Sequence, residues 1–236
     1  MKMNIVIPFR NTCGEEELQM CIRLIFKNLN KKWQKIYIIG DEVHIFNAFI
    51  RNIVIEEQKY NKWLDSNFLI KEYIEKIGEP FILFNDDFFL TNEVYNIPNY
   101  YCSYLSRRLK TTWIINEKTN ELKLSSYGLN IKSFIKNFGD YKNFEVHIPM
   151  EILYPDIMKK AIELCNINDC PALKRSMYML ICEENGYESA FEEKDYDVKF
   201  NEPLRVIQYP FFSLTDNVEF KAFKDKLDEI ADARED

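Results

Sequence analysis

The sequence predicts an α/β protein in which a mostly parallel central sheet lies between layers of helices and is followed by a more irregular, helical second half. Short apolar runs alternate with amphipathic segments over the first 90 residues, in the order strand, helix, strand, strand, helix, strand. This order is typical of a three-layer arrangement. Residues 81–84 form a continuously apolar run, as in strands that are buried on both faces.

Four strands and two helices are expected in the first half. The strands are residues 4–8, 35–40, 53–55 and 81–84. Thr12 and Glu15 have the spacing of a capping box, which predicts a helix start just before the apolar positions between Leu18 and Leu29. Residues 65–67 can begin the second helix, and Gly78 ends it.

A hairpin and three helices are expected in the second half. Residues 113–115 and 122–124 flank a polar turn and predict the hairpin. Pro155 and Pro171 are expected in the first turns of two helices, and a last helix follows Asn217. The aromatic residues and arginines between 100 and 108 would either stack on a base or sugar, or form a helix that packs its aromatic face.

Composition narrows the class of protein. At 236 residues and 47% hydrophobic side chains, with only six glycines and eight prolines, the chain is expected to form a single domain over residues 1–236. A formal net charge of −7 argues against broad nonspecific affinity for nucleic acid. Six cysteines without a C-x-x-C pair indicate buried thiols in a reducing compartment. We find no signal peptide and no apolar run of bilayer length, so we expect a cytoplasmic protein without a membrane span.

Two adjacent carboxylates follow the central apolar run. Asp86 and Asp87, with Asn85 before them, are expected at the carboxyl end of a central strand, where open α/β sheets bind their ligands. Two such oxygen donors suit a divalent cation that also holds a diphosphate, although they would equally suit a strand-end turn or a helix cap. Arg10 follows the first strand and would meet a phosphate at the same edge, unless it is an ordinary surface arginine. No G-x-G-x-x-G or Walker-type loop is present.

The second half offers further candidates. His147 lies in a short β-like run before Pro149, a rigid setting that suits either proton transfer or a structural histidine. Lys174 and Arg175 lie near the amino end of a predicted helix, with Arg175 opposite its apolar face, toward either solvent or a cleft that holds an anion. Asp216 has the spacing of a helix cap.

The order of these motifs resembles the Stealth family, whose members include bacterial capsule sugar-phosphate transferases and the lysosomal-enzyme N-acetylglucosamine phosphotransferase. The matching blocks are Phe84-Asn85-Asp86-Asp87, His147-Ile148-Pro149, Lys174-Arg175-Ser176 and Thr215-Asp216-Asn217. The last block departs from the family pattern because Thr215 replaces an asparagine. The loop after the first strand departs as well, since Pro8-Phe9-Arg10-Asn11 stands where the family has a Trp-Val-Asp-Gly type loop.

The resemblance implies a GT-A-like fold that binds a nucleotide sugar together with Mg²⁺ or Mn²⁺. Residues 1–92 would then form the nucleotide-sugar-binding half, and residues 93–236 the acceptor and catalytic half. Asp86 and Asp87, with Asp216, would hold the metal and the donor diphosphate. His147 would take the proton of an acceptor hydroxyl on a glycan or other molecule.

In the same reading, Arg175 would steady the phosphoryl oxygens with Lys174 or Arg10. Either a sugar-1-phosphate or a glycosyl group would be transferred from a UDP-sugar-type donor. Two alternatives stay open. One is a glycosyltransferase that acts on a modified nucleic-acid base or a surface glycan, with Arg107 and Arg108 on a nucleic-acid surface. The other is a sugar-nucleotide-binding protein without catalysis.

Overall fold

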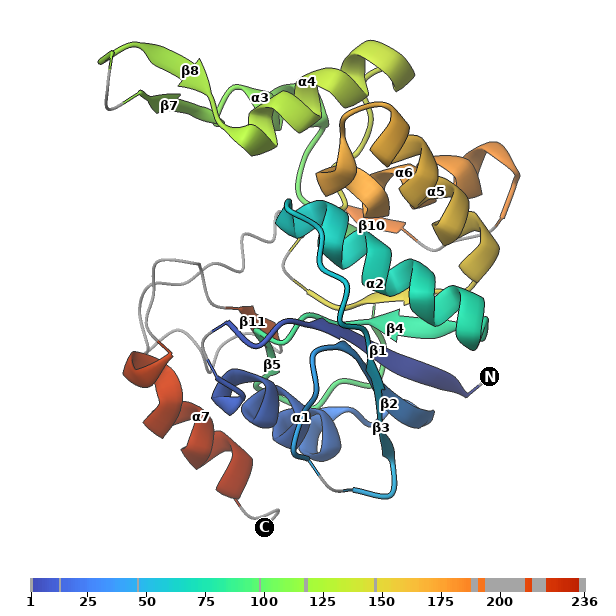
Figure 1. Ribbon diagram of the computed structural model, residues 1–236, viewed down its shortest axis with the longest axis vertical. Helices are drawn as coiled ribbons and strands as arrows, with labels where there is room; N and C mark the ends of the chain where they lie inside the picture. Colours follow the sequence, from blue (N-terminus) through green and yellow to red (C-terminus); the bar gives the residue numbers. More distant parts are fainter. Residues whose placement is uncertain are drawn as a thin grey trace.

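The computed structural model confirms the α/β class and the mostly parallel central sheet. It describes residues 2–12, 14–45, 47–97, 99–116, 119–146, 148–187, 191–193, 211–213 and 220–233. A five-stranded sheet runs in the order β3-β2-β1-β4-β9 (Figure 1). Its strands are β1 (Met3–Phe9), β2 (Trp33–Gly40), β3 (Ile50–Val54), β4 (Phe81–Leu83) and β9 (Met150–Ile152). The first four are parallel to their neighbours, and β9 pairs antiparallel with β4.

Three short strand pairs lie outside this sheet. They are β5 (Phe88–Leu90) with β11 (Phe211–Ser213), β6 (Asn99–Tyr101) with β10 (Phe191–Glu193), and β7 (Trp113–Ile115) with β8 (Leu122–Leu124). The β7–β8 pair is the hairpin that the sequence predicts, with the expected bounds.

Seven α-helices lie within the described ranges. They are α1 (Glu16–Asn28), α2 (Lys62–Lys76), α3 (Leu105–Leu109), α4 (Ser126–Phe138), α5 (Pro155–Ile167), α6 (Lys174–Glu184) and α7 (Lys221–Asp232). Helices α1 and α7 share one hydrophobic core with the sheet, and α2, α5 and α6 share the other. The sheet is therefore the middle layer of three (Figure 1).

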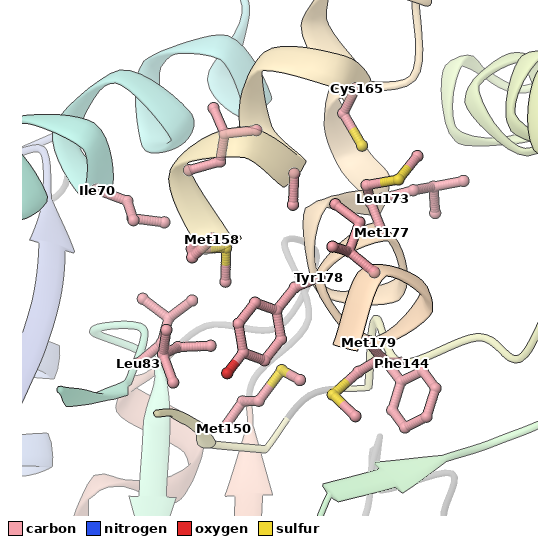
Figure 2. Close-up of a cluster of buried hydrophobic side chains, with 14 of the residues drawn as sticks. Ile70, Leu83, Phe144, Met150, Met158, Cys165, Leu173, Met177, Tyr178 and Met179 are labelled. Carbon is pink, nitrogen blue, oxygen red and sulfur yellow. The ribbon is translucent and has the colours of Figure 1, made fainter. Parts of the chain in front are cut away.

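Alternation along the central strands builds these two cores. In β4, Ile82 joins the core on the α1 side, whereas Phe81 and Leu83 join the core on the α2 side. Successive side chains of a strand point to opposite faces, so a continuously apolar run fills both cores at once. Figure 2 shows the second core, where Tyr178 of α6 lies between Met158 of α5 and Met150 of β9. Its hydroxyl accepts the backbone N–H groups of Leu153 (3.1 Å) and Tyr154 (3.3 Å), which ties α6 to the sheet.

Two predicted helix starts were wrong. Helix α1 begins at Glu16, and no side chain caps it, so the residues from Thr12 to Glu15 do not form a capping box. Helix α2 begins three residues earlier than expected, because the side chain of Asn61 caps it by accepting the N–H of Trp63 at 2.9 Å. Asp65 is freed from a capping role and binds Arg10 instead.

No helix in the described part of the chain is long and apolar enough to cross a bilayer.

Candidate functional site

The candidate site lies at the carboxyl ends of β1 and β4. The strand order changes direction at β1, because the chain proceeds from β1 to β2 and β3 on one side and later places β4 on the other. The crossover helices α1 and α2 leave to opposite faces of the sheet. Such a switch point opens a crevice beyond the strand ends, where α/β proteins bind ligands. Asn85, Asp86 and Asp87 follow β4 into this region and are half-buried.

Asp86 lies close to the first turns of α1. Burial raises the pKa of Asp86 to about 6, and the charge of Glu17 on α1 raises it further, although the backbone N–H groups of Asp86 and Asp87 act in the opposite direction. Burial likewise raises the pKa of Glu17. Two carboxylates therefore approach one another in a poorly hydrated place, which is unfavourable unless a cation or a proton accompanies them.

The side chain of Cys21 lies next to the segment that carries these carboxylates. Its thiol is buried and donates to the backbone oxygen of Asn85 at 3.6 Å. Burial, followed by the charges of Asp86 and Asp87, raises the pKa of the Cys21 thiol. The thiol is therefore protonated at neutral pH and packs beneath the carboxylates without acting as a nucleophile.

Asp87 lies on the side of the second half, near Arg175. Arg175 is only 5% exposed, and its guanidinium carbon lies 5.6 Å from the centre of the Phe88 ring. Burial lowers the pKa of Arg175, while the charges of Glu145 and Asp87 raise it. The structure thus brings together two residues that are 88 positions apart in the sequence. The sequence left open whether Arg175 faces solvent or a cleft, and its burial shows that it does not face solvent.

Arg175 also organises the chain around position 147. Its Nη1 atom donates to the backbone oxygens of Val146 (2.9 Å) and Ile148 (2.7 Å). Among the described residues, no acceptor contacts its Nε or Nη2 atoms, so three N–H groups are left for an anion. His147 itself lies outside the described residues, as does Asp216, and their predicted roles stay predictions.

Glu145 is an acidic residue next to Arg175, and the sequence motifs did not indicate its role. Its Oε1 atom accepts the backbone N–H groups of Arg175 (2.7 Å) and Ser176 (3.0 Å), and so caps the amino end of α6. Burial raises the pKa of Glu145, although Lys174 and Arg175 counteract the rise. The sequence does carry a signal for such a role, because Glu145 is an acidic residue inside the apolar run 144–149.

Lys174 is a second buried cation beside Glu145. It is 9% exposed, and burial lowers the pKa of its ammonium group to about 8 because the attraction of Glu145 offsets only part of the cost. The positive charge of Arg175 lowers the pKa further. Perturbed cations next to perturbed carboxylates are typical of sites that bind or transform a charged ligand.

Arg10 donates its hydrogen bonds to acceptors within the protein and not to a phosphate site. Its guanidinium donates to both carboxylate oxygens of Asp65 (2.7 and 3.1 Å), to Asp41 (2.8 Å), and to the backbone oxygens of Ile55 (2.7 Å) and Glu57 (2.6 Å). These five bonds use all five N–H groups of the side chain. Arg10 therefore joins the ends of β1, β2 and β3 to α2, and we assign it a structural role.

The carboxylate pair fits a nucleotide-bound magnesium or manganese ion better than a metal cage built wholly from protein. Within the described ranges, no group of three His, Cys, Asp or Glu side chains is placed to hold a metal ion. Mg²⁺ in nucleotide sites takes one or two carboxylates and completes its shell with phosphate oxygens and water. Asp86 and Asp87 supply that number of hard oxygen donors.

No protein-family model matches the chain. No curated protein matches it either.

Proposed function

We propose that this protein is a metal-dependent transferase of the GT-A type, related to the Stealth family. It would move a sugar-1-phosphate or a glycosyl group from a UDP-sugar-type donor to a hydroxyl group of a glycan or another acceptor. One observation carries the proposal: adjacent carboxylates lie at the switch point of a parallel sheet, and a buried arginine from the other half of the chain lies near enough for the charge of Asp87 to raise its pKa.

Asp86 and Asp87 would hold the metal ion in this reaction. A bound Mg²⁺ or Mn²⁺ would offset the negative charge that develops on the leaving phosphate group. The raised pKa of Asp86 supports such a role, because a nearby divalent cation stabilises the ionised form that burial disfavours.

Arg175 and Lys174 would bind the phosphoryl oxygens. The three remaining N–H groups of Arg175 can donate charge-assisted hydrogen bonds, and its fixed position means that little reorganisation is needed during the reaction. The Lys174 ammonium, with its pKa near 8, adds a positive charge at neutral pH. A bound diphosphate would raise that pKa again.

His147 would act as the general base. A neutral imidazole can take a proton from an acceptor hydroxyl near pH 7. Its assignment comes from the sequence motif, and its sequence neighbours Val146 and Ile148 are both held by Arg175. A substitution of Arg175 would therefore affect both phosphate binding and the backbone around the proposed base.

The test is incubation with a panel of nucleotide sugars and Mn²⁺ or Mg²⁺, followed by measurement of the released nucleotide. A monophosphate product such as UMP would show attack at phosphorus and transfer of a sugar phosphate, whereas UDP would show transfer of the sugar. We expect Asp86→Asn and Asp87→Asn each to lower kcat/KM by at least about a hundredfold.

Glu42→Gln is the matched control. Glu42 is exposed and follows β2 at the same edge of the sheet, outside the switch point, so the substitution should leave the rate unchanged. Failure of every nucleotide sugar to react with either metal would refute the transferase. If calorimetry then showed sugar-nucleotide binding that both aspartate variants retain, the chain would be a binding protein on this scaffold.

A further inference from the structure

The β7–β8 hairpin stands apart from the rest of the molecule. It projects from the end of α4 opposite the helical layer formed by α5 and α6 (Figure 1). Both of its three-residue strands are largely exposed. Its side chains are nevertheless apolar for the most part, which is unusual for a projecting surface hairpin.

One face of the hairpin is wholly apolar. Trp113 pairs with Leu124, and Ile115 pairs with Leu122, so these four side chains share a face. Three of them are strongly exposed: Trp113 (52%), Ile115 (60%) and Leu122 (69%). The opposite face carries the pair Ile114 and Lys123.

The hairpin is held firmly at its base. The backbone N–H of Ser125 donates to the oxygen of Thr112 at 2.8 Å, and the Ser125 side chain caps α4 by accepting the N–H of Gly128. A Cβ atom at Gly128 would lie 2.4 Å from Thr112 Oγ1 and 3.0 Å from Thr112 Cβ. Glycine at this position allows the close contact between α4 and the hairpin, so the apolar face is presented by a fixed support.

The segment that carries this apolar face has an excess of positive charge. From the start of α3 to the end of α4 the chain contains seven basic and two acidic residues, although the whole chain has a formal net charge of −7. Five of the basic side chains are exposed: Arg107, Lys110, Lys123, Lys132 and Lys136. An otherwise acidic protein thus has a net positive segment, and the exposed tryptophan, isoleucine and leucine of the hairpin belong to it.

We infer that the β7–β8 hairpin is a docking surface for the anionic face of a lipid bilayer. Trp113 suits the interfacial zone of a membrane, Ile115 and Leu122 would enter the acyl region, and the basic side chains would approach lipid phosphates. A protein partner fits less well. The apolar face consists of four side chains, of which Leu124 is half-buried, whereas each partner in a stable complex buries about 800 Å² over about 20 to 30 residues.

The inference is independent of the transferase activity, since it concerns binding alone. The test is co-sedimentation of the intact protein with vesicles of phosphatidylcholine, with and without phosphatidylglycerol. We expect binding to the anionic vesicles that weakens as salt is raised. Ile115→Ser should weaken this binding by about tenfold or more, because an apolar side chain no longer enters the acyl region.

Ile114→Ser is the matched control, since it makes the same change in the same strand on the opposite face. It should bind vesicles almost as the wild type does. Lys123→Glu should weaken binding by about fivefold or more, through the loss of attraction to anionic lipid. All three positions are exposed, so circular dichroism should show an unchanged fold.

Three results would overturn the inference. The first is that the wild-type protein ignores both kinds of vesicle. The second is that the two isoleucine variants lose binding equally, which would point to the strand as a whole. The third is a dimer in light scattering that Ile115→Ser dissociates, in which case the face joins two copies of the chain.

Discussion

At the residue scale, the candidate site is made of charged groups that are partly removed from water. Burial moves both Asp86 and Lys174 toward their neutral forms, with pKa values of about 6 and about 8. Each of these shifts costs folding free energy at neutral pH. Proteins keep such groups where a ligand uses them, which is why we place the site here and not at the well-paired Arg10.

The loss of folding stability that the ionised Asp86 carboxylate causes can be measured. Because its pKa is raised in the folded state, the carboxyl group disfavours folding increasingly as pH rises from about 4 to about 6, and the penalty stays constant above that range. Asp86→Asn should therefore raise the free energy of unfolding at pH 7.5 by about 1 to 3 kcal/mol, and leave it nearly unchanged near pH 4. Denaturant unfolding at both pH values is the measurement. Equal effects at both values would show that burial does not destabilise the ionised group.

The two perturbed groups also predict a pH profile for the proposed reaction. kcat/KM should rise as Asp86 loses its proton near pH 6, and fall as Lys174 loses its proton near pH 8. Lys174→Arg should move the alkaline limb upward by at least about two units, since arginine stays charged. A wild-type rate that stays constant through pH 10 would exclude Lys174 from the binding of the donor.

At the element scale, a single side chain joins the loops beyond three parallel strands. Arg10 leaves β1, meets Asp41 beyond β2 and the backbone beyond β3, and forms a two-bond pair with Asp65 in α2. Burial raises the pKa of Asp65, but the hydrogen bonds from Arg10 and from the Lys59 backbone outweigh it, so that the pKa is lowered overall. These bonds of Arg10 hold in place the loops that border the switch point.

Arg10→Lys should destabilise the protein by about 2 to 4 kcal/mol, because an ammonium group cannot reproduce five planar N–H contacts. Arg51→Lys makes the same change on β3, where the arginine is exposed and bonds only to nearby backbone oxygens. That control should change stability by less than about 0.5 kcal/mol. Thermal and denaturant unfolding of both variants would measure the two changes in stability. A similar small effect for both would mean that the hydrogen bonds of Arg10 contribute little to the free energy of unfolding.

At the scale of the whole molecule, the sheet couples two hydrophobic cores. Helix α7, near the end of the chain, packs on the same side as α1, near its beginning (Figure 1). Arg23 of α1 bonds Asp228 (2.6 Å) and Asp232 (2.8 Å) of α7 at the surface. Exposed ion pairs of this kind stabilise little, so the buried apolar contacts of α7 must hold the two ends together.

The predicted single domain implies that both cores unfold together. Ile82→Ala and Leu83→Ala remove neighbouring, fully buried side chains from opposite faces of β4. Each should cost about 2 to 5 kcal/mol and give one transition with an unchanged denaturant slope. Circular dichroism and tryptophan fluorescence should follow the same curve. A two-step transition in one variant only would indicate two separate folding units.

The sequence by itself determined the central strands, most of the longer helices and the strand-end position of the carboxylates, but it did not indicate α4. Apolar alternation and helical spacing are local properties, so they predicted the central strands, the hairpin at 113–124 and the helices from Pro155 onward. Asp86 and Asp87 were predicted beyond the central strand because charged side chains are not tolerated within a strand buried on both faces.

Only the tertiary structure decided which charges meet. A helical wheel gives the direction of Arg175 but not what lies there, and the contacts of α6 with Phe144, Val146 and Ile148 place Arg175 near Asp87. The same packing makes Glu145 the cap of α6. The ends of β1, β2 and β3 lie close together, and their acceptors therefore take up the N–H groups of Arg10. These contacts join residues 27 to 88 positions apart, and their free energy depends on burial, which exists only once the layers have packed.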